Sequence, residues 1–391
     1  MKVYKTYKFR MYPNREQQVT INKFVGTSRF IYNNCLAQVE EIYKNNRENI
    51  TIKVLEKELE KIKTNNPWLN EVDPSILITT LEDLEYGYKR YFIGKSKLPK
   101  FKVKLHNYDS YRTICRIWTY CEEEYSNIKL DMQNKILTLP KIGNIKIRGY
   151  RNIEEFNGKI INATVIKEAG KYYVALAVKE EIEEPEFNLN RVIGIDIGLK
   201  NIIVTSDGDK FESLWLKQER LEKRLQGLHK ALARRQKGSN NYKKMELKIK
   251  KLNMKIKNLN KHITHEITKK IIRENDVIII EDLDTKEMIE SCPRNLSRKI
   301  ASSGFSEITR QLTYKASWYN KKIIKIERFY PSSQLCSFCK FKNTELEDFR
   351  LRKFTCKNCS REIDRDINAS INILDRGMEI YLKSGEIEKH I

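Results

Sequence analysis

Hydrophobic and polar residues alternate along residues 2–12, with Lys8 and Arg10 on one face and mostly apolar or aromatic side chains on the other. This period of two predicts a half-buried strand whose outer face is basic. Asn14, followed three residues later by Gln17, predicts a capping box that starts a helix. Helical patterning then continues with interruptions to about residue 91, and Asn-Pro and Asp-Pro pairs predict the turns between helices.

The pattern changes at residues 98–113, which read LPKFKVKLHNYDSYRT. Basic residues alternate with aromatic ones here, so the segment could hold phosphates with its cations and stack bases on its rings. A surface loop with incidental tyrosines is the alternative. The candidate nucleic-acid contacts are Lys8 and Arg10 of the first strand and, in this segment, Lys100, Lys102, Lys104, Tyr108, Tyr111 and Arg112.

Residues 126–190 predict strands and turns, most clearly a hairpin formed by INATVIK and YYVALAVK. The acidic, proline-containing segment EEIEEPEFNLN at 180–190 predicts a linker between two domains. The second half then opens with two predicted strands, VIGID and NIIVT, which precede a long helical insertion.

That insertion, residues 216–273, predicts two helical arms joined by a Gly-Ser-Asn-Asn turn, with leucines and isoleucines spaced for antiparallel packing. Its outer faces carry many cations and few acids, which favours contact with a nucleic-acid backbone over a merely soluble surface. The candidate contacts near the turn are Arg234, Arg235, Lys243 and Lys244. The strand VIIIED, a polar loop through Cys292 and Pro293, a helix around 303–319 and the strand KKIIKIERF complete an α/β layout with a mixed sheet.

Charge strengthens the nucleic-acid interpretation. The 391 residues carry 75 Lys and Arg against 52 Asp and Glu, a net charge of +23. Such an excess indicates a polyphosphate partner, although solubility alone is the simpler alternative. No apolar stretch reaches the roughly 20 residues that cross a bilayer, and no signal peptide is evident, so we expect a cytoplasmic protein.

Three acidic residues lie at or near the ends of apolar segments: Asp196 in GIDIG, Glu281 in VIIIEDL and Asp366 in DRDIN. A carboxylate is costly to bury unless positive charge meets it, so three of them together indicate divalent metal ions and phosphate chemistry. Taken singly, each is more often a surface residue or a turn cap. Gly194 and Gly198 beside Asp196 would let other backbone or a substrate come close.

Four of the eight cysteines have metal-ligand spacing. Cys336 and Cys339 form one CxxC pair, and Cys356 and Cys359 form another after sixteen residues. This is the spacing of a four-cysteine zinc ribbon, and we expect structural Zn²⁺. A redox CxxC pair or a metal-free remnant is the alternative.

The ordered motifs GIDIGLKNIIVTSDG, VIIIEDL, YKASW, FYPSSQLCSFC and CKNCSREIDRDINASINIL resemble the TnpB (OrfB) proteins of insertion sequences. YKTYKFRMYPNREQQ and LPKFKVK extend the resemblance over nearly the whole chain. It implies an RNase H-like core of RuvC type, related to type V CRISPR effectors and loaded with a guide RNA. Asp196, Glu281 and Asp366, rather than Asp364, match the family's catalytic acids, which would bind Mg²⁺ or Mn²⁺.

The resemblance also implies the domain organisation. A wedge-like β-barrel would comprise residues 1–13 and 111–185, with a helical recognition domain at 14–110; the RuvC-like core would span 186–335, a zinc ribbon 336–361, and the end of the core with a tail 362–391. The chain departs from the family at Lys340 and Ser360, where glycine usually follows each knuckle, and at Ile363, where histidine is common. These departures put the knuckle turns in question more than the metal.

The expected function is a transposon-encoded RNA-guided DNA endonuclease whose partners are a guide RNA and target DNA. A compact type V CRISPR effector and a guide-dependent DNA-binding repressor without cleavage remain alternatives. The sequence does not predict the oligomeric state, the guide or the target-adjacent motif.

Overall fold

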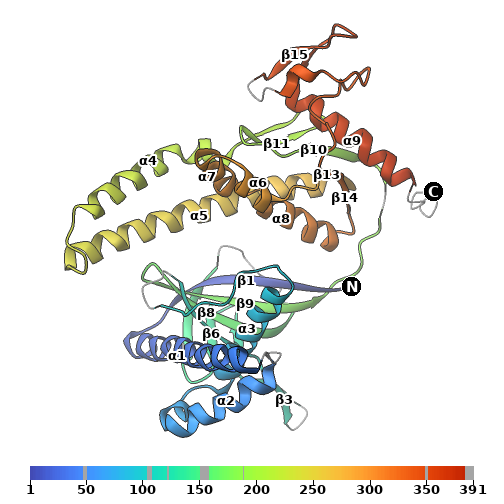
Figure 1. The fold of residues 1–391 in the computed structure, drawn as a ribbon. Coiled ribbons are helices and arrows are strands. Elements are labelled where there is room, and N and C mark those ends of the chain that lie inside the picture. The colour runs from blue at the N-terminus through green and yellow to red at the C-terminus, as the bar shows by residue number, and fades with distance from the viewer. Residues whose placement is uncertain are drawn as a thin grey trace. The chain divides into compact units, whose positions relative to one another are not determined.

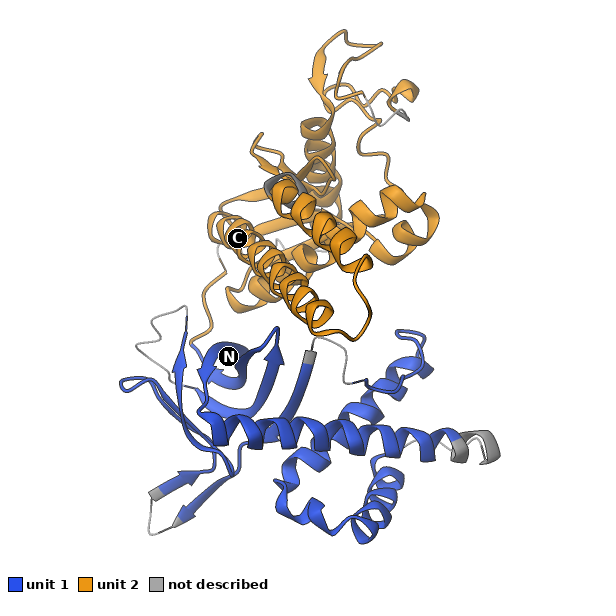
Figure 2. Ribbon diagram, turned by 90° about the vertical axis from the view of Figure 1, so that its left-hand side faces the viewer, with its two compact units in different colours: residues 1–182 blue, residues 183–391 orange. Residues whose placement is uncertain are grey.

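The structure is a computed structural model that describes residues 1–46, 51–103, 108–120, 123–149, 158–187, 189–347 and 351–383. It divides into two compact units, residues 1–182 and 183–391 (Figure 2). The division falls inside the acidic segment 180–190 that the sequence marks as a linker. No described helix is long and apolar enough to span a membrane.

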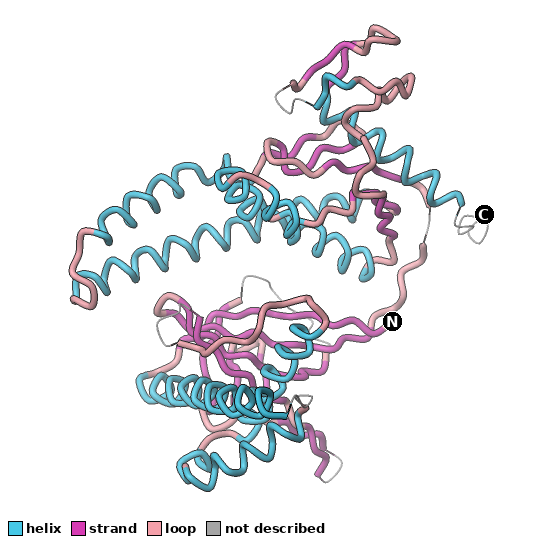
Figure 3. Tube along the Cα trace, viewed as in Figure 1, coloured by secondary structure: helices cyan, strands magenta, loops and turns pink. Residues whose placement is uncertain are grey.

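The first unit is built on an antiparallel sheet of seven strands in the order β2-β8-β9-β1-β7-β6-β5. Its strands are among those drawn in magenta in Figure 3. The predicted first strand is confirmed, because Phe9 and Met11 of β1 are buried while Lys8 and Arg10 alternate with them. The predicted hairpin is confirmed as β8 and β9. Within the described residues the end strands β2 and β5 do not pair, so the barrel stays a prediction. The strands are β1 (Lys2–Tyr12), β2 (Tyr108–Ile114), β5 (Lys129–Asp131), β6 (Ile136–Leu139), β7 (Gly143–Arg148), β8 (Lys159–Glu168) and β9 (Lys171–Glu181), with a separate hairpin β3 (Ile117–Tyr120) and β4 (Glu123–Ser126).

The helices of this unit follow β1 in the chain. The capping box is confirmed, because the Gln17 amide donates to Asn14 Oδ1 at 2.8 Å and the Asn14 amide donates to Gln17 Oε1 at 3.0 Å. Asp73 caps the last long helix by accepting from the Ser75 amide. The helices form a hydrophobic core of their own beside that of the sheet. They are α1 (Arg15–Asn46), α2 (Ile52–Asn65), the 3₁₀ turn η1 (Pro67–Glu71) and α3 (Pro74–Phe92).

The second unit contains a mixed sheet of five strands in the order β12-β11-β10-β13-β14. The neighbours β10, β13 and β14 run parallel, β11 pairs antiparallel with β10, and β12 pairs antiparallel with β11. This confirms the predicted α/β layout with a mixed sheet. The strands are β10 (Val192–Asp196), β11 (Asn201–Thr205), β12 (Lys210–Glu212), β13 (Val277–Glu281) and β14 (Lys322–Ile326).

Helices cover both faces of this sheet. Alternate residues of β13 point in opposite directions: Ile278 and Ile280 pack with α5 and α8, whereas Ile279 packs with α9 (Figure 1). Gly194 is needed for the contact with α9, because a Cβ atom there would lie 2.3 Å from the Ser370 carbonyl oxygen. The expectation that glycine beside Asp196 admits another backbone is therefore confirmed.

The helical insertion forms two arms, α4 and α5, that lie side by side (Figure 1). Ser239 caps the second arm by accepting from the Tyr242 amide. The polar loop predicted through Cys292 and Pro293 is wrong: Asp284 accepts from two following amides and starts the short helix α6, and α7 begins directly after Pro293. The helices are α4 (Leu214–Ala233), α5 (Asn240–Glu274), α6 (Thr285–Ser291), α7 (Arg294–Ser303), α8 (Phe305–Trp318) and α9 (Arg365–Lys383); the cysteine segment before α9 holds η2 (Thr344–Glu347), β15 (Lys353–Thr355) and β16 (Glu362–Asp364).

Candidate active site

Two of the three predicted acids end neighbouring parallel strands. Asp196 is the last residue of β10 and Glu281 is the last residue of β13. Because Ile195 pairs with Ile280, the two acids lie next to each other at the carboxyl ends of these strands. Asp366 lies in the first turn of α9, where it accepts a 3.4 Å hydrogen bond from Asn201 at the start of β11. The fold therefore brings together three acids that are far apart in the sequence.

The electrostatics show that these acids interact. Burial and, after it, the negative charges of Glu281 and Asp366 raise the pKa of Asp196 to about 8, although Arg365 and Arg352 act in the opposite direction. Burial also raises the pKa of Glu281, although a hydrogen bond from Ser332 opposes that rise. The site is short of positive charge, which is the environment that divalent cations complete.

Two polar side chains that sequence patterns did not single out contact the acids. The Ser332 hydroxyl donates to Glu281 Oε1 at 2.6 Å, and Arg352 Nη1 donates to Asp366 Oδ1 at 2.9 Å. Ser332 belongs to the motif FYPSSQLC, so the resemblance to the TnpB family could have pointed to it. Arg352 follows no periodic pattern, and only the fold places it here.

Asp364 and Asp366 have different roles in the structure. Asp364 Oδ1 accepts from the amides of Asp366 and Ile367 at 3.1 and 3.2 Å, and its other oxygen accepts from Lys210 at 2.6 Å. Those contacts make Asp364 the cap of α9. Asp366 is the residue whose charge acts on Asp196.

The four predicted cysteines also come together. Their sulfur atoms all lie within 4.8 Å of one another, with Cys336 to Cys359 at 3.7 Å and Cys339 to Cys356 at 3.6 Å. Four sulfurs bound tetrahedrally to one zinc ion at about 2.3 Å would be about 3.8 Å apart, so the donor set and its spacing fit zinc.

The predicted contacts of the first strand lie on the outer face of the sheet. Arg10 lies over the Tyr12 and Tyr173 rings, at 5.6 and 5.0 Å from their centroids. Lys8 lies 4.5 Å from the Tyr173 centroid and 3.7 Å from Glu168. This face therefore combines cations with aromatic rings.

The segment 98–113 is mostly held within its own unit. Lys102 lies 4.0 Å from the Tyr32 centroid, its pKa is lowered by burial, and Asn33 bonds both its amide and its carbonyl. Lys100 is exposed. Lys104 lies outside the described residues, and for Tyr108 only the backbone is described.

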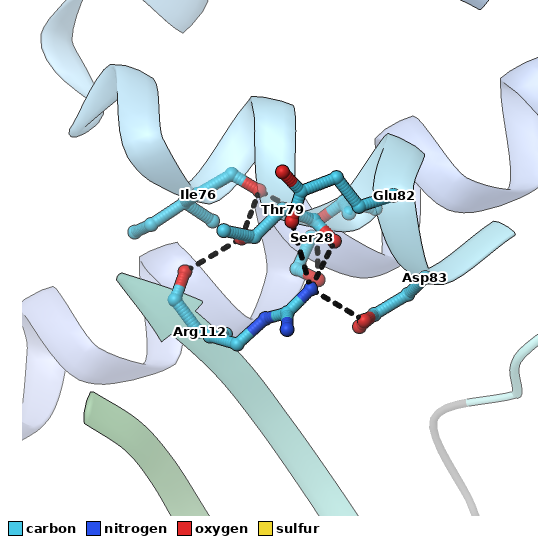
Figure 4. Close-up of polar contacts among 7 residues, drawn as sticks. Ser28, Ile76, Thr79, Glu82, Asp83 and Arg112 are labelled. Atoms are coloured by element: carbon cyan, nitrogen blue, oxygen red, sulfur yellow. Dashed lines mark hydrogen bonds and ion pairs between the residues drawn. The ribbon is translucent and has the colours of Figure 1, made fainter. Parts of the chain in front are cut away.

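Tyr111 and Arg112 have intramolecular partners. The Tyr111 ring is buried in the core and packs edge-on against Phe24, so it has no free face for a base. Arg112 donates to Glu82 at 3.1 Å and to Asp83 at 2.8 Å on α3 (Figure 4). The buried ring therefore supports the packing of β2 on α1, and the paired guanidinium supports its packing on α3.

The remaining predicted cations lie at the turn between α4 and α5. Arg234, Arg235, Lys243 and Lys244 are all exposed, and Arg235 also donates to the Asn241 carbonyl at 3.2 Å. The turn thus presents concentrated positive charge to solvent, the arrangement expected of a surface that meets phosphates.

Three family models match parts of the chain: a "Helix-turn-helix domain" at residues 1–48, a "Probable transposase" at 175–291 and a "Cas12f1-like, TNB domain" at 305–373. The chain is 30% identical over 402 aligned residues to "Putative RNA-guided DNA endonuclease InsQ" of Escherichia coli K12, covering 99% of this chain and 95% of that protein. It is 28% identical to the "Putative RNA-guided DNA endonuclease" of Streptomyces pristinaespiralis, covering 96% and 90%. A chain from the cryo-EM structure of a Cas12f1–sgRNA–target DNA complex has a similar fold, with a TM-score of 0.58 at 13% identity over 95% of this chain and 98% of that one.

Proposed function

Because this chain belongs to the TnpB (OrfB) family, we propose that it is a transposon-encoded, RNA-guided endonuclease that hydrolyses phosphodiester bonds of target DNA. The observation that carries the proposal is the meeting of Asp196, Glu281 and Asp366 at one edge of the mixed sheet. Burial and the repulsion between the carboxylates raise the pKa of Asp196, so the site lacks the positive charge that would balance its acids. Divalent metal ions would supply that charge and would also bind phosphate groups.

The three carboxylates are the residues that would hold divalent cations, Mg²⁺ or Mn²⁺. Bound there, such cations activate water and stabilise the charge that develops on a phosphodiester during cleavage. Ser332 fixes the orientation of Glu281 by donating to Oε1. Arg352 neutralises Asp366 through Oδ1, and its half-exposed guanidinium could also meet a phosphate oxygen.

The cysteine cluster would hold structural Zn²⁺ through all four thiolates of Cys336, Cys339, Cys356 and Cys359. Four protein ligands leave no open position, so this ion would have no direct part in the chemistry. The ion would instead hold the folded segment that precedes α9.

Guide RNA and target DNA are the proposed partners. Base pairing would select the target, while the protein would bind the nucleic-acid backbone and a short flanking motif. The proposed contacts are the aromatic and basic face around Arg10 and the exposed cations at the turn of the helical hairpin 216–273. We assign residues 1–13 and 111–185 to a wedge-like domain, 14–110 to a recognition domain, and 186–335 with 362–391 to the RuvC-like core.

The first test uses neighbouring acids as matched variants. Asp196→Ala and Glu281→Gln should abolish cleavage of a guide-matched target while RNA and target binding remain. Asp282→Asn is the control, because Asp282 follows Glu281 directly but lies half exposed and pairs with Lys325. Cleavage by either active-site variant at the wild-type rate would refute the assigned centre.

The second test identifies the guide. The protein is purified with its bound RNA, and that RNA is sequenced. A defined species that carries transposon-end sequence supports the proposal, a species that carries repeat-array sequence identifies a CRISPR effector instead, and random cellular RNA argues against guided cleavage.

A further inference from the structure

The two cysteine knuckles have the same backbone and different side-chain contacts. In each, the amide of the residue after the CxxC pair donates to the carbonyl of the first cysteine at 2.9 Å. Those residues are Lys340 and Ser360, with φ angles of 58° and 57°. This left-handed conformation suits glycine, so both residues adopt it against their intrinsic preference.

Only the first of the two is anchored to another element. Lys340 Nζ donates to Asn372 Oδ1 at 3.0 Å and pairs with the carboxylate of Asp375, and both partners lie on α9. The Ser360 hydroxyl makes no hydrogen bond to any residue that the structure describes. The lysine therefore gives the first knuckle a connection to α9 that the second knuckle lacks.

Two asparagines continue this connection inside the protein. Asn368 and Asn372 are fully buried and lie one helical turn apart on the same face of α9. Their amide nitrogens donate to the Leu335 carbonyl at 2.6 and 2.7 Å, and Asn372 also donates to the Ser332 carbonyl at 2.8 Å. Asn368 Oδ1 in turn accepts from the Ser337 amide at 2.7 Å. Together they fasten residues 332–337 to the helix.

The fastened segment contacts one of the proposed catalytic acids, Glu281, and the helix carries another, Asp366. Ser332, at the start of the segment, donates to Glu281 Oε1 at 2.6 Å. Asp366 belongs to the first turn of α9, about 1.7 turns before Asn372. The position of Glu281 relative to Asp366 thus depends on how the segment sits on α9.

We propose that Lys340, Asn368 and Asn372 are positioning residues that lock the first cysteine knuckle onto α9 and thereby hold Glu281 and Asp366 in the geometry that binds divalent cations. The inference rests on the proposed function, because the spacing of these carboxylates matters only if they share such ions. Residues that orient ligands from outside the ligand shell affect metal affinity without touching the metal.

Lys340→Gly and Ser360→Gly are matched variants that test the proposal. Both variants remove a side chain from a residue with the same left-handed backbone conformation, but only Lys340→Gly removes a contact with α9. Lys340→Gly should raise the Mg²⁺ concentration for half-maximal cleavage several-fold, with the zinc content and guide-RNA affinity unchanged. Ser360→Gly should leave the Mg²⁺ requirement unchanged, and Lys340→Arg, which keeps the cation, should restore it. Equal Mg²⁺ requirements for both glycine variants would overturn the proposal.

Metal binding without cleavage supplies an independent measurement. Mn²⁺ affinity is measured by calorimetry on the full chain, and Asn372→Leu should weaken it about tenfold, within the range seen for ligand-orienting residues. Hydrogen exchange at the amides of residues 332–340 should also accelerate in this variant. Unchanged Mn²⁺ affinity in both Asn372→Leu and Lys340→Gly would refute the positioning role. Failure of the proposed function would appear differently, as absence of guided cleavage by the wild type, and Mn²⁺ affinity would still decide the role of these residues.

Discussion

The four-cysteine cluster and the proposed site of Asp196, Glu281 and Asp366 differ in how the chain assembles them. The cysteines all lie within residues 336–359, and turns with local hydrogen bonds place them. The carboxylates end two strands and begin a helix, so only the complete sheet with α9 on its face brings them together. One site is a local motif and the other is a product of the fold.

The two sites differ equally in their electrostatics. The cysteines offer four ligands at tetrahedral spacing, which closes a site around one ion. The acids repel one another, and Asp196 holds its proton to about pH 8. A closed site stabilises structure, whereas an open site with unbalanced charge remains able to take up ions and substrate. We therefore expect substitutions of the acids to lower the cleavage rate and substitutions of the cysteines to lower the stability.

The largest expected effect separates Asp366 from Asp364. Asp366→Ala should reduce cleavage by roughly a hundred- to a thousandfold, as loss of one essential electrostatic group does in other enzymes. Asp364→Ala should remove the cap of α9 and the ion pair with Lys210, lowering stability by about 1–2 kcal/mol and leaving most of the cleavage activity. Rate measurements and urea unfolding of both variants provide the check. A larger loss of cleavage in Asp364→Ala would reverse the assignment.

The next effect concerns stability and comes from the cysteine cluster. Cys356→Ser should lower the zinc content and the melting temperature, since structural zinc contributes about 10 kcal/mol or more to the folding of small modules. Cys292→Ser is the control, because Cys292 lies outside the cluster. Chelation that removes zinc from the wild type without lowering its melting temperature would show that the cluster is not structural.

The pH dependence of stability should report on the carboxylates. The folded-state pKa of Asp196, about 8, is above that of an unfolded aspartate, so the native state binds more protons between the two values. Stability without metal should therefore fall as the pH rises from about 5 to about 8 and level off above that. Asp196→Asn should flatten this slope. Because cations must displace the proton, the Mg²⁺ needed for half-maximal cleavage should decrease over the same range. A melting temperature that rises with pH in the wild type would contradict the raised pKa.

Sequence patterns predicted features that depend on neighbouring residues. The capping box at Asn14, the alternation of β1 and the CxxC pairs each rest on spacings of a few positions, and each appears in the structure. The mixed α/β sheet followed from the order of apolar segments. The short helix α6 was missed because its polar sequence lacks an apolar period, although its cap at Asp284 was a visible signal.

Contacts between distant segments could not be predicted in the same way. The sequence showed cations at Lys102 and Arg112, and the structure gives both of them protein partners, Tyr32 for the first and Glu82 with Asp83 for the second. Composition cannot tell a cation that faces solvent from one that pairs with a neighbouring helix. Arg352 shows the converse, because a residue without any local pattern contacts a candidate catalytic acid.

The smallest expected effect returns to the cysteine cluster and tests whether its backbone strain is real. Ser360 has a φ of 57°, which a residue with a side chain adopts at a cost of about 1 kcal/mol. Ser360→Gly should therefore stabilise the zinc-loaded protein by up to about 1 kcal/mol, less the entropy that glycine adds to the unfolded chain. Lys340→Gly should gain less, because it also loses an exposed ion pair worth about 0–1 kcal/mol. Urea unfolding at saturating zinc measures both differences. If Ser360→Gly destabilised the protein, the entropy of the unfolded chain would outweigh the strain, and the two knuckles would differ only in their contacts with α9.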